Sequence, residues 1–448
     1  MMHSYRTCAA LLGFAALALT PGKAPAQANA PAPMSSAPAS EHMPTLQLGA
    51  GWTLTGMAQA FPVVTIGQPE GDEGDPLRMT ELYLTQPAVM ANLESPGQRF
   101  VLRTTLNFEG LTQEDGELTP GGWGEGFIDR RHPHTLVHEL MLSFNLWDFA
   151  GGSASLSAGK GFAPYGTSDP MARPGLKYPT NHHLSQILER WTLNATWLRG
   201  PWSLEAGLFG GQEPDGPYDF SNIESFGDSW SVRVARRWGA GSGPASEWEA
   251  SASFGSITEF AHTVEETTRL VNGALLHSGP LGSGELYGLV EGSWSFLEDH
   301  SSLFSFLGEA RYATGKHQPY LRVEYARRPE YGREAASGDD FFRYEHHEDP
   351  IGSTRWLIAT AAYAYEATGT PWSVRPFVEV QHHQARRDRG NVSATDLFGS
   401  TSFWAVSVGA RVFLGGGPMR MGSYGVLDAM THMQRAMASG TGMEGHVH

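Results

Sequence analysis

Residues 190–197 read RWTLNATW, and this stretch decides the fold because apolar and polar side chains alternate at every residue. On an extended chain, successive side chains point to opposite faces. The apolar face would carry Trp191, Leu193, Ala195 and Trp197, and the polar face Arg190, Thr192, Asn194 and Thr196. The same alternation recurs at 230–235, 321–326, 372–379 and 404–414. The pattern predicts an all-β protein.

Segments rich in Gly, Pro, Asp and Asn, which favour turns, separate about sixteen such strands between residues 49 and 415. We predict strands at 50–62, 82–95, 98–110, 136–148, 152–163, 186–199, 202–212, 226–239, 246–259, 267–280, 283–298, 303–315, 317–330, 353–368, 371–387 and 401–414.

The lengths of the connections distinguish a membrane barrel from a soluble β-sandwich, in which the apolar faces would pack on each other. Connections after even-numbered strands are mostly short, whereas 111–135, 164–185 and 331–352 are long. Short periplasmic turns opposite long extracellular loops are typical of a transmembrane antiparallel β-barrel. Tryptophans beside the short turns would form an aromatic belt; these are Trp147, Trp197, Trp202, Trp238, Trp248 and Trp372.

Such a barrel has to close, because an unpaired strand edge is costly in hydrocarbon. Residues 401–414 should therefore pair with 50–62. Sixteen strands usually enclose an aqueous lumen. By parity, the wall of this lumen would carry charges of both signs. No strong preference for cations or anions is therefore expected. The charged residues are Arg103, Glu109, Glu139, Arg190, Glu205, Arg233, Arg237, Glu249, Glu309, Arg311, Arg322, Glu324, Arg375, Glu379 and Arg411.

The N-terminus resembles an export signal. Arg6 precedes an apolar run from Cys8 to Leu19, and small residues follow at 24–28. We predict a cleaved signal peptide over 1–28, a periplasmic Pro/Ala-rich linker over 29–48, the barrel over 49–415 and a Met/His-rich periplasmic tail over 416–448. The localisation that follows is the bacterial outer membrane, with lipid and lipopolysaccharide as partners.

Composition excludes several classes of function. Cys8 is the only cysteine, so a processed chain has neither disulfides nor Cys-ligated metal. The net charge is −16, and removing residues 1–28 takes away Arg6 and Lys23 but no acid. Nucleic-acid binding is therefore disfavoured.

The connection 164–185 is a candidate constriction, because its prolines, charges and aromatic residues are typical of an ordered loop. If it folds inward, charged side chains would set selectivity at the narrowest point. The residues at this point would be Lys160, Asp169, Arg173, Glu189 and Arg190, with Arg233, Arg322 and Glu324 on the lumen wall. A surface cap made of the same residues is the alternative.

Histidines gather in the predicted extracellular loops, and imidazole with carboxylate binds zinc or copper. The candidate ligands are His132, His134, His182 and His183. Loop-to-loop hydrogen bonding over the pore mouth is the alternative. The Met/His tail offers a second candidate, for Cu(I). The sequence of the tail also predicts a short helix over Gly425 to Ser439. The alternative to copper binding is that this helix is amphipathic and plugs the base of the barrel.

A hydrolase with its active site at the barrel rim is a further alternative for the function. The sequence has no G-x-S-x-G elbow, and Ser, His and Asp occur in no diagnostic order. We therefore predict no enzyme and no catalytic residue.

Four segments resemble a family of uncharacterised bacterial outer-membrane β-barrel proteins: DRRHPHTLVHEL (129–140), GKGFAPYGTSDPMARPGLKYPTNHHLSQILER (159–190), GLFGGQEPDGPYDF (207–220) and DSWSVR (228–233). The similarity covers roughly residues 50–330. Members of this family are frequent companions of copper-handling genes, which implies a metal-binding or metal-transport role. The resemblance implies no substrate and no catalytic residue.

The function that the sequence favours is a porin-like channel for small polar solutes or ions. An outer-membrane protein that binds or transports copper or zinc is the first alternative, and the rim hydrolase is the second. No cofactor is certain, and the oligomeric state is left open.

Overall fold

The computed structural model describes residues 44–68, 79–112, 114–115, 127–128, 135–167, 172–175, 179, 184–214, 216, 218–220, 222–239, 247–261, 264–297, 302–330, 352–369, 372–390, 393–398, 400–415, 421–428 and 431. The predicted signal peptide and most of the linker lie outside these residues. At the end of the predicted linker, Thr45–Gln47 form β1, which pairs with β2.

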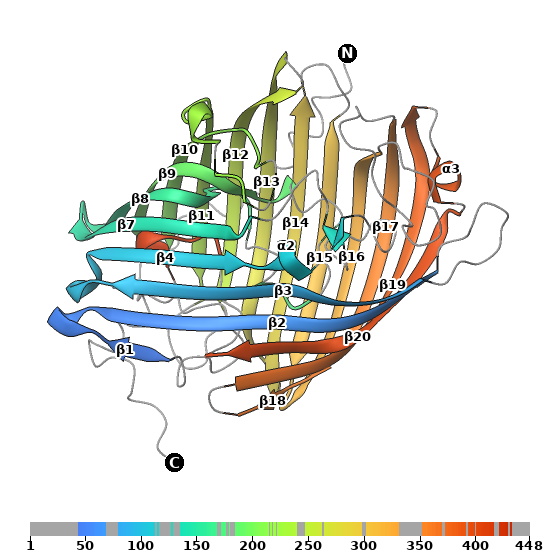
Figure 1. Ribbon diagram of the computed structural model, residues 1–448, viewed down its shortest axis with the longest axis horizontal. Coiled ribbons are helices and arrows are strands. Elements are labelled where there is room, and N and C mark those ends of the chain that lie inside the picture. Colours follow the sequence, from blue (N-terminus) through green and yellow to red (C-terminus); the bar gives the residue numbers. More distant parts are fainter. Residues whose placement is uncertain are drawn as a thin grey trace.

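Sixteen antiparallel strands in these ranges form one sheet that closes on itself (Figure 1). Around the barrel they are β2 (Thr53–Gln68), β3 (Met79–Glu94), β4 (Phe100–Asn107), β7 (Val137–Phe149), β8 (Gly152–Ala163), β9 (Ile187–Arg199), β10 (Trp202–Phe209), β11 (Ser229–Trp238), β12 (Glu247–Ala261), β13 (Val264–Leu281), β14 (Gly284–Leu297), β15 (Leu303–Ala313), β16 (His317–Glu330), β17 (Gly352–Tyr365), β19 (Trp372–Gly390) and β20 (Ser402–Leu414). Every strand predicted from the sequence is present, so the fold prediction is confirmed.

Short elements complete the described chain. β18 (Ala367–Thr368) extends the sheet beside β19, and β5 (Glu114–Asp115) runs parallel to β6 (Phe127–Ile128). The helices are α2 (Glu109–Thr112) and α3 (Ala394–Phe398), and the 3-10 turns are η1 (Gly49–Gly51), η2 (Pro96–Gln98), η5 (Asn222–Ser225) and η6 (Gly425–Leu427). Within the described residues, no helix has the length and apolar character needed to cross a membrane.

The barrel closes between its first and last long strands, as predicted. β2 and β20 are paired from Ala58 opposite Leu414 to Gln68 opposite Trp404. Pro62 lies in the middle of β2, and a Cβ on Gly409 would come within 2.4 Å of the Pro62 carbonyl oxygen. A glycine is therefore required where the two strands approach each other around the proline.

Polarity is inverted relative to a soluble protein. On β16, Leu321 and Val323 are 63% and 53% exposed on the outer face, whereas Arg322 and Glu324 between them are buried on the inner face. β11 repeats the pattern, with Trp230 and Val232 outside and Arg233 inside. An apolar outer surface around a polar interior is the arrangement that suits a barrel immersed in lipid.

The two ends of the barrel differ as expected. Residues 95–99, 150–151, 200–201, 282–283 and 314–316 make short connections at one end, and the predicted belt tryptophans adjoin this end. Trp238 and Trp248 stack there with ring centroids 6.2 Å apart. Most connections at the other end are longer, and the exceptions are 262–263 and 298–302.

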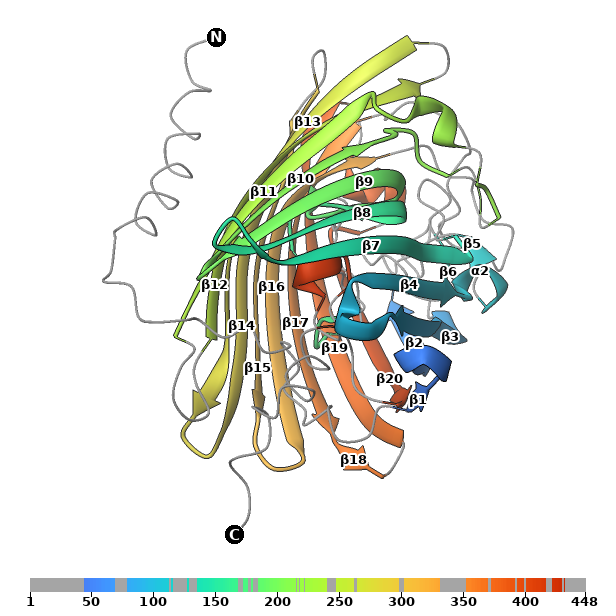
Figure 2. The ribbon, with the colours of Figure 1, turned by 90° about the vertical axis from the view of Figure 1, so that its left-hand side faces the viewer.

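The interior differs from the open aqueous lumen that the strand number predicts. All of the charged side chains expected on the inner wall are indeed inward-facing, but each is less than a tenth exposed. They are buried because they pair with one another and because two segments enter the barrel. These are part of the connection after β8 and the chain beyond β20, whose red ribbon lies within the ring of strands in Figure 2.

Candidate functional site

The inward connection begins at the end of β8 and is held first by the neighbouring wall. The Gly166 amide donates to Ser253 Oγ on β12 at 2.8 Å, and Arg233 Nε on β11 donates to the Gly166 carbonyl at 2.8 Å. Arg233 also pairs at 2.6 Å with both Glu205 and Glu249. The start of the connection is therefore fixed by a fully paired arginine.

The connection then reaches strands far from β8 around the ring. Arg173 pairs with Glu291 on β14 at 2.9 Å, and Thr167 donates to the same carboxylate at 2.9 Å. From β20, Arg411 Nη1 donates at 2.9 Å to the carbonyls of Arg173 and Pro174. Residues 164–167 and 172–175 consequently lie in the barrel interior, in contact with strands on different sides of the ring.

Electrostatics favour this position of Arg173. Burial would lower the pKa of its guanidinium, but the nearby carboxylates of Glu291 and Glu309 raise that pKa above its ordinary value. The arginine therefore stays charged. A buried charge is tolerated when it is paired in this way, and the loss of one partner is costly.

The segment beyond β20 forms a second internal obstruction along the inner wall. Tyr424 Oη donates to Glu139 at 2.9 Å and accepts from the Phe162 amide at 3.0 Å. Asp428 pairs with Arg103 at 3.2 Å and accepts from Asn92 at 3.2 Å. Residues 421–428 are thus fixed to the inner wall of β3, β4, β7 and β8.

The predicted helix over Gly425 to Ser439 does not begin as expected. Gly425–Leu427 form a single 3-10 turn, and Asp428 is extended. Gly425 has φ +60°, and a Cβ there would lie 2.2 Å from Ser155 Oγ. The chain has this 3-10 turn instead of the first turn of an α-helix because its backbone lies close to β8 and because Tyr424 and Asp428, on either side, are held to the wall. Except for Thr431, the remainder of that range, from residue 429, lies outside the described residues.

The candidate constriction residues fall into separate groups. Lys160 donates to Thr135 Oγ1 at 2.7 Å, and Glu189 contacts the Thr135 amide at 2.8 Å and His138 Nδ1 at 2.5 Å. Arg190 instead pairs with Glu213 and Glu259, and Arg322 pairs with Glu324. Arg173 belongs to the Glu291 group described above, so these side chains do not converge on one point.

Several predicted residues cannot be placed. Asp169 and the proposed metal ligands His132, His134, His182 and His183 lie outside the described residues. Within the described part of the chain, no group of three or more His, Cys, Asp or Glu side chains is arranged to hold a metal ion.

Sequence reasoning missed several contributors to the interior, among them Glu291, His138, Tyr424 and Asp428. His138 is fully buried against Glu189. Alternation could not reveal His138, because it lies next to the inward Glu139 where the register of β4 and β7 shifts. For Tyr424 the only signal is its position between two glycines, Gly422 and Gly425.

Comparison with known proteins gives likeness of fold only. No protein-family model matches the chain, and no curated protein sequence matches it either. Similar solved structures include the outer membrane channel DcaP of Acinetobacter baumannii, with a TM-score of 0.48 and 10% identity over 82% of this chain and 99% of that one.

Two further structures are similar. OmpT, an outer membrane protein of Vibrio cholerae, has a TM-score of 0.46 and 10% identity over 82% of this chain and 99% of its own. An anion-selective porin from Comamonas acidovorans has a TM-score of 0.43 and 12% identity over 81% and 100%. None of the three names refers to copper. The assignment of this chain to the outer-membrane β-barrels rests on its own closed sheet and apolar outer face.

Proposed function

We propose that the protein is a narrow, porin-like channel of the outer membrane for small polar solutes or ions. The observation that supports this proposal is the position of residues 172–175 in the interior, held by the pairing of Arg173 with Glu291 and by the contacts of Arg411. An inward loop on a charged wall is a means of restricting passage by width and by charge.

The balance of charge supports a channel for small polar species without strong preference for one sign. Most inward arginines pair with carboxylates, as Arg103 does with Glu139 and Asp428, and Arg233 with Glu205 and Glu249. Because these pairs offset each other, width rather than net charge would dominate selection. The C-terminal segment, which is fixed to the inner wall of β3, β4, β7 and β8, narrows the passage further.

The test is conductance of the purified protein in planar lipid bilayers. We expect a small unitary conductance, and a larger one in the double variant Arg173→Ala/Arg411→Ala, because the loop loses its anchors on β14 and β20. Arg355→Ala is the matched control, since this arginine is 44% exposed and contacts neither the loop nor the tail. If neither conductance nor solute flux into vesicles is measured for the parent protein, the proposal is wrong.

The metal hypothesis remains a prediction with its own test. Calorimetric titration with Cu(I), Cu(II) and Zn(II) should show binding that disappears when His132, His134, His182 and His183 are changed to alanine. Unchanged affinity in that variant would contradict the assignment. The rim hydrolase would require turnover that depends on one particular Ser or Asp.

A further inference from the structure

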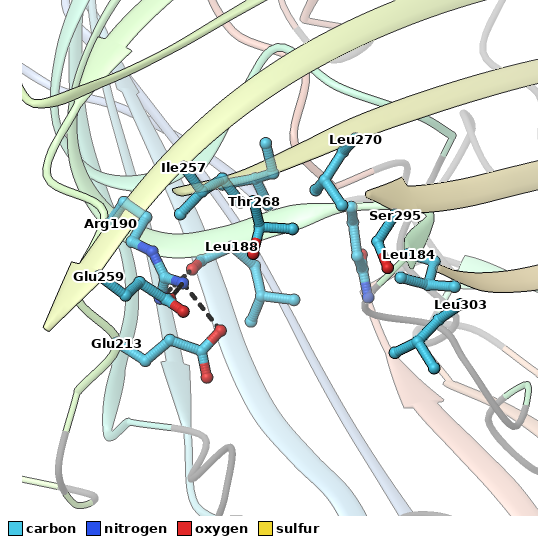
Figure 3. A pocket seen from close by; sticks show the side chains of 12 residues that line it. Leu184, Leu188, Arg190, Glu213, Ile257, Glu259, Thr268, Leu270, Ser295 and Leu303 are labelled. Atoms are coloured by element: carbon cyan, nitrogen blue, oxygen red, sulfur yellow. Dashed lines mark hydrogen bonds and ion pairs between the residues drawn. The ribbon is translucent and has the colours of Figure 1, made fainter. Parts of the chain in front are cut away.

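A cavity of about 190 Å³ lies inside the barrel toward the end with long connections (Figure 3). Its walls come from the end of the connection after β8, the start of β9, the connection between β10 and β11, and β12, β13, β14 and β15. Leu184 and Arg190 thus link it to the candidate constriction, but the Arg173 anchor on Glu291 and the C-terminal segment contribute no lining residue.

One side of the cavity is apolar. The aliphatic side chains that line it are Leu184, Ile187, Leu188, Ile257, Leu270 and Leu303. A cavity of about 150 Å³ lined by such side chains stays dry and binds benzene. The space here is large enough for a phenyl ring or a short alkyl chain.

The other side is acidic. Arg190 Nη2 lies between two carboxylates, 2.7 Å from Glu213 Oε1 and 3.3 Å from Glu259 Oε1 (Figure 3). Glu259 is 41% exposed, and Glu213 places a second carboxylate beside the same guanidinium. A cationic group entering the cavity would therefore be attracted to Glu259.

Buried polar atoms of the lining indicate room for a ligand. Within the described residues, Gln186 Oε1, Ser295 Oγ and Arg190 Nε have no hydrogen-bond partner, and all three side chains are at least nine-tenths buried. Buried polar groups are normally satisfied, so such atoms call for a specific explanation. Ser295 lies near Leu184 and Leu303, across the cavity from Glu259, so it is not a partner for a group bound at Glu259 (Figure 3).

We infer that this cavity binds a small amphipathic organic cation, with a phenyl or short alkyl body against the leucines and a primary ammonium beside Glu259. A carboxylate ligand would meet the acidic side with the wrong charge, and a bare metal ion would leave the apolar side empty. The inference goes beyond the proposed channel, because binding does not require conduction.

Isothermal titration of the full chain in maltoside detergent tests the inference, with 2-phenylethylammonium as the probe. Three analogues separate its features: 2-phenylethanol lacks the charge, 3-phenylpropanoate reverses it, and methylammonium lacks the apolar body. We expect the probe to bind about tenfold more tightly than each analogue. Equal affinity for the probe and the alcohol would overturn the acidic half of the inference.

Two variants locate the site. Glu259→Gln should weaken binding of the probe about tenfold without affecting the alcohol, and Leu270→Phe should abolish binding by filling the apolar side. Glu224→Gln, an exposed acid on the connection between β10 and β11, is the matched control and should change nothing. Each variant is first checked for the heat-dependent gel mobility of a folded barrel.

If Leu270→Phe is folded and still binds the probe with the parent affinity, the cavity is not the site. Because binding is measured at equilibrium without a membrane, a protein that fails to conduct can still pass this test, and a conducting one can fail it.

Discussion

At the scale of single residues, charge pairing determines what the barrel interior can do. Burying a guanidinium or a carboxylate is costly unless a partner is at hydrogen-bonding distance. Glu291 illustrates the solution, because it accepts from Arg173 at 2.9 Å and from Asn272 at 2.8 Å. The same contacts that satisfy the buried charge also hold the loop across the barrel.

Gly175 provides a residue-scale prediction about the loop. A Cβ at this position would lie 2.7 Å from Tyr320 Oη, so Gly175→Val should push the loop away from β16 and raise the unitary conductance. Gly216→Val is the control, because no atom lies within 4 Å of a Cβ built there. An identical conductance in both variants would show that the loop does not limit passage.

Tyr424 provides a second prediction at this scale. Tyr424→Phe removes the hydrogen bond to Glu139 and should lower the free energy of unfolding by about 2 kcal/mol, the usual range for a bond to a charged group. Tyr218→Phe, at a 60% exposed tyrosine, should have no effect. Denaturant titration in lipid vesicles, followed by tryptophan fluorescence, measures both.

The same tyrosine carries a pH dependence. Burial, and then the charge of Glu139, raise the pKa of Tyr424 well above its ordinary value of 10.0. The neutral phenol is therefore favoured in the folded state, and its contribution is complete below about pH 10 and is lost as the pH rises further. The difference in stability between the parent and Tyr424→Phe should stay constant from neutral pH to about pH 10. A difference that shrinks below that pH would contradict the buried position.

At the scale of elements, strand positions could be predicted from the sequence because alternation and turns are local signals. The prediction for β8 coincides with Gly152–Ala163. β2 was expected to stop at Pro62 but continues to Gln68, since a glycine on β20 makes room for the proline. β4 was expected to run to residue 110 but ends at Asn107, whose side chain accepts from the Glu109 amide and starts α2.

Contacts across the interior could not be predicted in the same way. The pairing of Arg173 with Glu291 and of Tyr424 with Glu139 joins residues far apart in the sequence. These contacts depend on barrel diameter, strand tilt and the path of the connections, none of which leaves a periodic signal. The charges that the parity rule placed inside do face inward, but the rule missed Glu291 and could not show which charges meet.

At the scale of the whole molecule, the central claim is a closed sheet with lipid outside and paired charges inside. Closure depends on β2 meeting β20, since open edges in hydrocarbon would each leave several unpaired amides. The two segments that enter the interior then decide how much of the enclosed space remains for solutes. A substitution that alters these two segments can therefore change the width of the channel while the closed sheet stays the same.

Cross-linking of β2 to β20 tests this claim most directly. Val64 and Val408 are direct partners in the register of these strands, so cysteines at both positions, with Cys8 replaced by serine, should form a disulfide in lipid vesicles. Cysteines at Val64 and Val323, on β2 and β16, should not. The account predicts a cross-linked product for the first pair alone, seen as altered mobility of the unfolded, unreduced chain. Absence of that product in a protein that is soluble without detergent would contradict it.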